Sequence, residues 1–238
     1  MNELILAASV ICIFGAVLAA YRLFGDTGLY GMTVAVTILS NIEVLILVVA
    51  FGMEQTLGNV LFAATFLITD ILSENSGKKA ANRAVFLGIG ASVFFAVLTA
   101  SWQLYVPADS DWVMPSIRVV FSTTPRLVLA SMSVYAVSQL LDVWLYHKWW
   151  GFTDKKFGDH RKYLWLRNNG STLISQFVNT VLFNLGAFAG MEGYTPALLT
   201  HIIFSGYAIY VVTSLLDTPV VYLARRIHEH QKATPNRA

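Results

Sequence analysis

Apolar residues occupy this chain in runs of about 20 residues, and short stretches rich in Gly, Pro, Asp or Asn separate most of the runs. A helix needs about 20 predominantly apolar residues to cross the hydrocarbon core of a bilayer. The pattern therefore predicts an all-α, polytopic bundle of about seven membrane helices. The predicted spans are roughly 4–22, 29–50, 57–74, 85–106, 119–146, 169–190 and 198–223.

The first apolar run also has the length of a signal peptide. It lacks the Lys or Arg that opens such a peptide, because Glu3 precedes it, and it continues to about Ala20. A signal peptide has a positively charged start and an apolar region of only 7–15 residues. We therefore expect a retained span.

Composition supports the membrane interpretation. The chain is 56% hydrophobic and 13% charged, with a mean hydropathy of +0.60, whereas soluble domains are about 25% charged. Its net charge of +2 comes from cations gathered in particular loops, so we expect contact with lipid and not with nucleic acid. The single cysteine, Cys12, excludes an intramolecular disulfide.

The cations alternate between loops. Fourteen of the sixteen Lys and Arg follow the first, third, fifth or seventh predicted span, and the other two, Arg118 and Arg126, belong to the fifth span. Loops that carry Lys and Arg stay in the cytoplasm, so the N-terminus is predicted outside and the C-terminus inside. An extra or missing helix would scramble this bias, which favours seven spans over six or eight.

Residues 147–168 mix six cations with six aromatic residues. This composition is typical of a segment at the membrane interface, where aromatic rings lie at headgroup level and cations face anionic lipid. We favour that interpretation over a partner surface. His228 and His230 lie in a polar tail, so we expect no metal there.

Carboxylates and amides inside the predicted spans are the candidate functional residues. A carboxylate at the centre of a membrane helix costs about 2.5–3.5 kcal/mol, so one that is present usually faces a cavity or a partner. Asp70, Asp142 and Asp217 are predicted near one depth, in the cytoplasmic half, and Gln139 shares a helical face with Asp142. The sixth span adds a polar stripe, namely Ser171, Thr172, Ser175, Gln176, Asn179 and Thr180.

Several charges leave two interpretations open. Glu74 follows Asp70 by one helical turn and either pairs with Lys78 at the interface or belongs to the site. Asp217 precedes Pro219 by two residues, so its carboxylate either satisfies the backbone of a kink or contacts a ligand. In the fifth span, Arg126 steers an anion or pairs with Glu43, and we favour the ion pair. Gating or charge-pair roles are assigned to Glu74, Arg126, Asp217 and Glu43.

The sequence lacks the residues that three other classes of membrane protein require. A retinal protein needs a lysine in the last span, and 198–223 has none. An intramembrane serine protease would have only Ser205 with His201, and a haem protein needs paired histidines in the membrane. The nucleotide motif G-x-x-x-x-G-K-[ST] is absent. We therefore expect a transporter, not an enzyme, and no cofactor.

Three motifs resemble the vitamin uptake transporter family, also called the queuosine precursor transporter family. They are TFLITDILSENSGKKAANRA at 65–84, SQLLDVW at 138–144 and STLISQFVNTVLFN at 171–184. The resemblance begins near Tyr30, which makes 1–28 an extra N-terminal span, 29–224 a six-helix core and 225–238 a cytoplasmic tail of one domain, 1–238. The family's polar positions correspond to Asp70, Arg126, Gln139, Asp142, Gln176 and Asn179.

The resemblance implies an inner-membrane importer of 7-deazaguanine bases such as queuine, preQ0 or preQ1. Such a base presents N–H and NH2 donors suited to a carboxylate, and a carbonyl suited to a side-chain amide. The implied substrate-binding residues are Asp70, Gln139, Asp142, Gln176 and Asn179. Two alternatives stay open. The first is a self-sufficient importer that works by alternating access or facilitated transport, as a monomer or a homodimer, and the second is a membrane substrate-binding subunit that needs a separate energy-coupling complex.

Overall fold

The computed structural model describes residues 1–121, 125–159, 161–190 and 192–233, without the side chains of 54 and 125–129. Helices dominate these residues, and one two-stranded ribbon interrupts them. The elements are α1 (Asn2–Glu43), β1 (Leu47–Ala50), β2 (Met53–Thr56), α2 (Gly58–Asn75), α3 (Lys78–Trp102), α4 (Met114–Phe121), α5 (Pro125–Phe157), α6 (Leu164–Phe188) and α7 (Pro196–Ala233).

Helix α1 is a helical hairpin. Gly25 leaves helical geometry with φ 58° and ψ −142°, a region that glycine reaches at no steric cost. The Asn2 side chain donates a hydrogen bond to the Val49 carbonyl at 2.8 Å, which an unbroken helix of about 60 Å would not permit. The predicted turn between the first two spans therefore lies where the structure reverses direction.

The second predicted span ends early, and this corrects the all-α expectation. The helix stops at Glu43, and residues 47–50 pair instead with Met53–Thr56 as an antiparallel ribbon. Phe51 and Gly52 form the turn with φ values of 52° and 71°. Positive φ at both central residues is the geometry of a two-residue turn that matches the twist of its strands.

Helix α2 lies at the centre of the bundle. Most of its residues are buried, including Phe66, Asp70 and Ser73, and it packs against α1, α3, α5 and α7. Among the described residues, α1, α3 and α7 are long and apolar enough to cross a membrane. Helices α2, α5 and α6 turn polar residues toward one another, which lowers their hydropathy.

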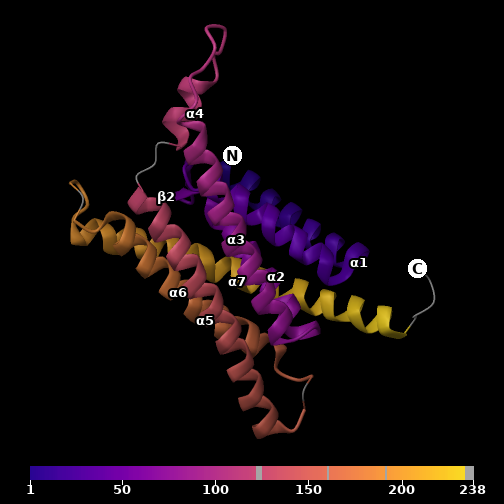
Figure 1. The fold of residues 1–238 in the computed structure, drawn as a ribbon. Helices are drawn as coiled ribbons and strands as arrows, with labels where there is room; N and C mark the ends of the chain where they lie inside the picture. The colour runs from indigo at the N-terminus through magenta and orange to yellow at the C-terminus, as the bar shows by residue number, and fades with distance from the viewer. Residues whose placement is uncertain (122–124, 160, 191, 234–238) are drawn as a thin grey trace.

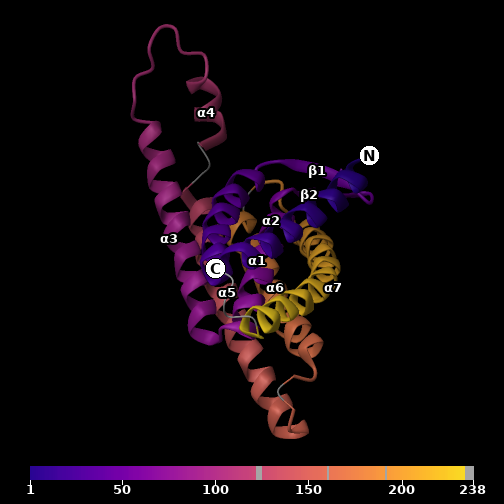
Figure 2. The same cartoon turned by 90° about the vertical axis from the view of Figure 1, so that its right-hand side faces the viewer.

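The bundle has two distinct ends. At one, the ribbon lies beside the N-terminus, where the Phe51 amide donates to Glu3 at 3.1 Å; we call this the hairpin end. At the other, Ser76 donates to Asp26 at 2.8 Å and Gln231 donates to the Arg22 carbonyl at 2.9 Å. This second end, the cationic end, brings together loops that carry most of the Lys and Arg. Figures 1 and 2 show α4 and the connection between α5 and α6 projecting in opposite directions.

Candidate functional site

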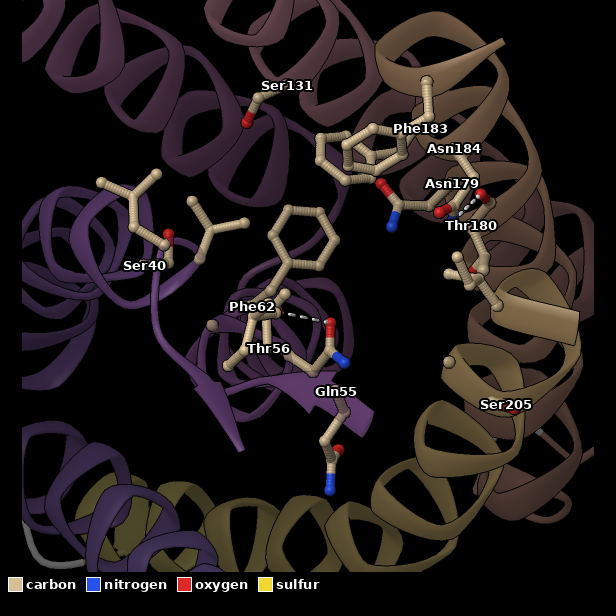
Figure 3. A pocket seen from close by; sticks show the side chains of 18 of the residues that line it. Ser40, Gln55, Thr56, Phe62, Ser131, Asn179, Thr180, Phe183, Asn184 and Ser205 are labelled. Carbon is tan, nitrogen blue, oxygen red and sulfur yellow. Dashed lines mark hydrogen bonds between the residues drawn. The ribbon is translucent and has the colours of Figure 1, made fainter. Parts of the chain in front are cut away.

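A pocket of about 730 Å³ opens among α1, the ribbon, α2, α5, α6 and α7. It lies toward the hairpin end, because Gln55 of β2 and Tyr194, which precedes α7, both line it. Such a volume lies within the range of pockets that hold drug-sized molecules. Figure 3 shows the amides of Asn179 and Asn184 along one wall and Thr56 and Gln55 along another.

Aromatic rings close the deep side of this pocket. Phe62 contacts Tyr135 and Tyr210 edge to face, with ring centroids 5.9 and 6.2 Å apart, and it stands in the middle of the lining in Figure 3. Phe66 packs against Phe62 from one turn further along α2, at 5.5 Å. We call Phe62, Tyr135 and Tyr210 the pocket floor. Edge-to-face pairs stabilise by about 0.5–1.5 kcal/mol beyond their buried area.

Polar groups ring the floor as well. The Tyr210 hydroxyl donates to the Asn59 carboxamide oxygen at 3.1 Å, and Ser138 donates to Asn179 at 3.3 Å. Gln55 is nearly buried, and neither of its amide atoms bonds to another described residue. A buried amide without a partner costs about 1–3 kcal/mol, so the pocket offers donors and acceptors that a polar ligand would satisfy.

We expect Gly88 to be required beside the floor. A methyl group added there would overlap the Tyr135 hydroxyl, whereas one added at Gly90, on the same helix, would meet nothing within 4 Å. Gly88→Ala should destabilise the protein by about 1–3 kcal/mol through overpacking. The measurement is thermal unfolding in detergent with Gly90→Ala as the control, and equal melting temperatures for the two variants would contradict this packing.

The predicted site residues gather about 12 Å beyond the floor, since Asp70 follows Phe62 by eight residues of α2. Asp70, Gln139, Asp142 and Gln176 have no exposed surface, and none of them lines the pocket. Of the five residues predicted to bind substrate, Asn179 alone reaches it. The structure thus brings the carboxylates and amides together but seals four of the five from the pocket.

The three aspartates form a carboxyl layer with donors from α6. Thr172 donates to Asp70 at 3.0 Å and Ser175 donates to Asp142 at 2.8 Å. The amide of Asn168 donates to Asp217 at 2.8 Å. The Asp217 carboxylate therefore has a side-chain donor on α6.

Gln139 joins α5 to α2 just above this layer. Its amide nitrogen donates to Thr65 at 2.5 Å, and its carbonyl accepts from Thr69 at 3.3 Å. Both contacts lie between Phe62 and Asp70 along α2. Gln139 therefore fixes the spacing of the two helices between the pocket floor and the carboxyl layer.

A charged layer follows toward the cationic end. Arg167 binds both oxygens of Glu74, at 2.6 and 2.8 Å, and Tyr146 donates to the same carboxylate at 2.7 Å. Arg225 adds a contact to Glu74 at 3.4 Å, and the Arg167 guanidinium lies 4.4 Å from the centre of the Trp150 ring. Glu74 thus pairs with Arg167 and not with Lys78 as one interpretation of the sequence had it.

Arg167 and Trp150 escaped the sequence interpretation, which assigned residues 147–168 to the membrane surface. Arg167 is fully buried. It lies four residues before Ser171, so the polar stripe of α6 begins one helical turn earlier than predicted. This spacing is the feature of the sequence that indicates a place for Arg167 on the polar face. The side chain of Arg126 lies outside the described residues, and its pairing with Glu43 stays a prediction.

Comparison with known proteins gives two matches. Residues 56–224 match the family model described as "Putative vitamin uptake transporter". Over 214 residues the chain is 34% identical to the "Probable queuosine precursor transporter" of Bacillus subtilis (strain 168), which covers 90% of each chain. No solved structure matches. The family match includes the pocket floor, the carboxyl layer and the charged layer up to Arg167, and stops one residue before Arg225.

Proposed function

We propose that this chain, which belongs to the vitamin uptake transporter family, imports precursors of queuosine. These precursors are the 7-deazaguanine bases queuine, preQ0 or preQ1. The chain is a membrane protein and a transporter, not an enzyme. The observation that carries the proposed substrate is the 34% identity to a relative named for queuosine precursors over 90% of both chains.

Seven spans with the N-terminus outside and the C-terminus in the cytoplasm are part of this proposal. The break at Gly25 supports two antiparallel spans within α1. The gathering of cation-bearing loops at one end supports the orientation, since such loops stay in the cytoplasm. The pocket then opens outward from the inner membrane, as an importer that is ready to receive its substrate requires.

The lining of the pocket suits a planar, hydrogen-bonding base. Rings of Phe62 and Tyr210 offer faces and edges for stacking, and the amides of Asn179, Asn184 and Gln55 offer both donors and acceptors. Such a mixture of apolar walls and few polar groups is typical of small-molecule sites. We assign first contact with the base to these residues.

The sealed layers support alternating access. The pocket floor separates the base from the carboxyl layer, and the charged layer closes the path to the cationic end. Movement of the floor would bring a base to Gln176 and Gln139, and opening of the Glu74–Arg167 pair would release it. Transporters of many folds move their two gates around a central site in this way.

We expect Asn179→Ala to weaken import, since it removes an amide that faces the cavity (Figure 3). Loss of one hydrogen bond to a neutral partner costs about 0.5–1.5 kcal/mol, or about twofold to tenfold in apparent affinity. The measurement is queuosine in the tRNA of a cell that cannot make it, with precursor at limiting concentration. Gln231→Ala, an exposed amide at the cationic end, is the control.

The purified chain in liposomes separates the two functional alternatives. Uptake of queuine by the chain alone would support a self-sufficient importer, and binding without uptake would support a subunit that needs a coupling complex. Failure to bind queuine, preQ0 and preQ1 alike would contradict the substrate assignment. A homodimer remains part of the proposal and is tested by the mass of the purified particle.

A further inference from the structure

Asp70 and Asp142 are fully buried at the centre of the bundle, and each accepts a hydrogen bond from α6. Their hydrogen-bond donors, Thr172 and Ser175, lie three residues apart on that helix, so the two carboxyl groups face the same stretch of α6. Thr172 occupies one oxygen of Asp70, and Ser175 occupies one oxygen of Asp142. The second oxygens, Oδ1 of Asp70 and Oδ2 of Asp142, accept no hydrogen bond from a described residue.

Two neighbouring carboxyl groups that are both buried favour the binding of a proton. An ionised carboxylate only accepts hydrogen bonds, so two carboxyl oxygens can bond to each other only when one of them carries hydrogen. Two like charges in contact within a low-dielectric interior repel strongly, and one of the pair then remains protonated. The burial of Asp70 and Asp142 and the closeness of their donors on α6 therefore favour an acid pair that holds one proton.

The surrounding charges do not neutralise a second negative charge on the pair. Asp217 of α7 adds a carboxyl group on one side, and Glu74 of α2 lies one turn away. Arg167 of α6 is the near cation, but Glu74 and the Lys162 carbonyl occupy its guanidinium.

The remaining neighbours are no better placed to neutralise the pair. Tyr146 of α5 is neutral and donates to Glu74. On α3, Arg83 stacks on Tyr30 of α1, with its guanidinium carbon 5.3 Å from the ring centre. A second negative charge on the acid pair would therefore lack a nearby free cation among the described residues.

An unpartnered amide lies between the acid pair and the pocket. Gln176 follows Thr172 by one turn of α6, so it shares the face that holds Asp70, and it is fully buried. Neither its nitrogen nor its oxygen bonds to a described residue. Asn179, three residues further, lines the pocket. A buried amide left open at this point indicates a group or a water that arrives from the pocket side.

We propose that the Asp70–Asp142 pair is a proton-binding site through which this protein couples import to proton movement, an inference that rests on the proposed function. A hydronium ion on the pocket side transfers one proton to a carboxylate oxygen of the pair and leaves as water, which changes the charge of the pair from −2 to −1. The same O–H bond breaks when the pair meets water at the cationic end, and the proton leaves as hydronium. No oxidant or other reactant is involved.

The conformational consequence follows from charge. With one proton, the pair tolerates the closed layers seen here. Without it, two adjacent carboxylates need water or a cation, and both become available when the charged layer opens toward the cytoplasm. A proton that binds one conformation more tightly than the other shifts the populations toward the tighter one, by the difference in binding free energy. The conformation in turn changes the affinity of the pair for a proton.

The test uses the purified full-length chain in liposomes, with labelled queuine and an outside that is more acidic by about one pH unit. One proton per substrate should give about tenfold accumulation at equilibrium, since one pH unit corresponds to 1.36 kcal/mol. A protonophore should abolish the accumulation. Asp142→Asn should abolish it too, whereas Asp109→Asn in the exposed stretch 104–113 should not.

The outcomes separate the two proposals. Equal accumulation with and without the pH gradient would overturn proton coupling and leave the proposed function standing. Absence of queuine, preQ0 and preQ1 uptake would contradict the proposed function itself. If Asp142→Asn does not fold, the gradient on the parent protein still decides, and the loss of a protonated-carboxyl infrared band in Asp70→Asn provides a second readout.

Discussion

Arg167→Met is expected to lower the stability of this protein by about 3–5 kcal/mol, because it leaves Glu74 as a buried carboxylate without its two short hydrogen bonds. Arg225 lies 3.4 Å from the same carboxylate and compensates only in part. The measurement is the shift of thermal unfolding in detergent. Arg161→Met is the matched control, since the Arg161 side chain is exposed and its contact with Glu229 is 3.7 Å long, an arrangement that contributes little.

A double variant distinguishes lost charge compensation from lost packing. Adding Glu74→Gln to Arg167→Met removes the uncompensated charge, so part of the lost stability should return. If the double variant is as unstable as the sum of the two single changes, the pair does not act as a unit. Equal melting temperatures for Arg167→Met and Arg161→Met would contradict the buried geometry of the charged layer.

Phe62→Leu is expected to weaken queuine binding by about fivefold to 150-fold. This range corresponds to the 1–3 kcal/mol by which stacking of a base on an aromatic ring stabilises binding. Phe62 stands in the middle of the pocket lining, and its replacement by leucine retains bulk but removes the flat face. Binding to the purified protein in detergent is the measurement, and Phe62→Tyr should retain most of the affinity.

Phe86→Leu serves as the control for that experiment, because Phe86 is exposed on α3 and does not line the pocket. An affinity for Phe62→Leu equal to that of the parent would show that the base does not stack on the floor. A melting temperature that falls as far for Phe62→Leu as for Gly88→Ala would indicate a packing effect, and binding would then be compared at a lower temperature.

The sequence predicted the arrangement of helices well where apolar runs end at a strong signal. Glycine at position 25 and the cations after Asn75 mark turns that the structure contains. The family resemblance is confirmed by both comparisons. The ribbon was missed because 47–50 is as apolar as a membrane helix, and hydropathy alone does not separate a short strand from the end of a helix.

The sequence predicted which residues gather at the candidate site better than it predicted whether the pocket reaches them. Helical spacing placed Asp70, Asp142 and Gln176 at one depth, and the structure buries all three. The sequence could not reveal that Phe62, Tyr135 and Tyr210 separate these residues from the pocket. Aromatic residues are frequent throughout the chain, and their contacts depend on how each helix is rotated. Arg167 was obscured by the cations around it in sequence.

The burial of α2 also bears on how the chain enters the membrane during synthesis. This helix carries Asp70 and Glu74 and is less apolar than its neighbour α3, from which Ser76 and Gly77 alone separate it. Acidic residues raise the free energy of insertion for a segment that leaves the translocon alone. We infer that α2 and α3 partition into lipid together as a hairpin, and that α2 becomes shielded from the acyl chains only after α5 and α7 have been made.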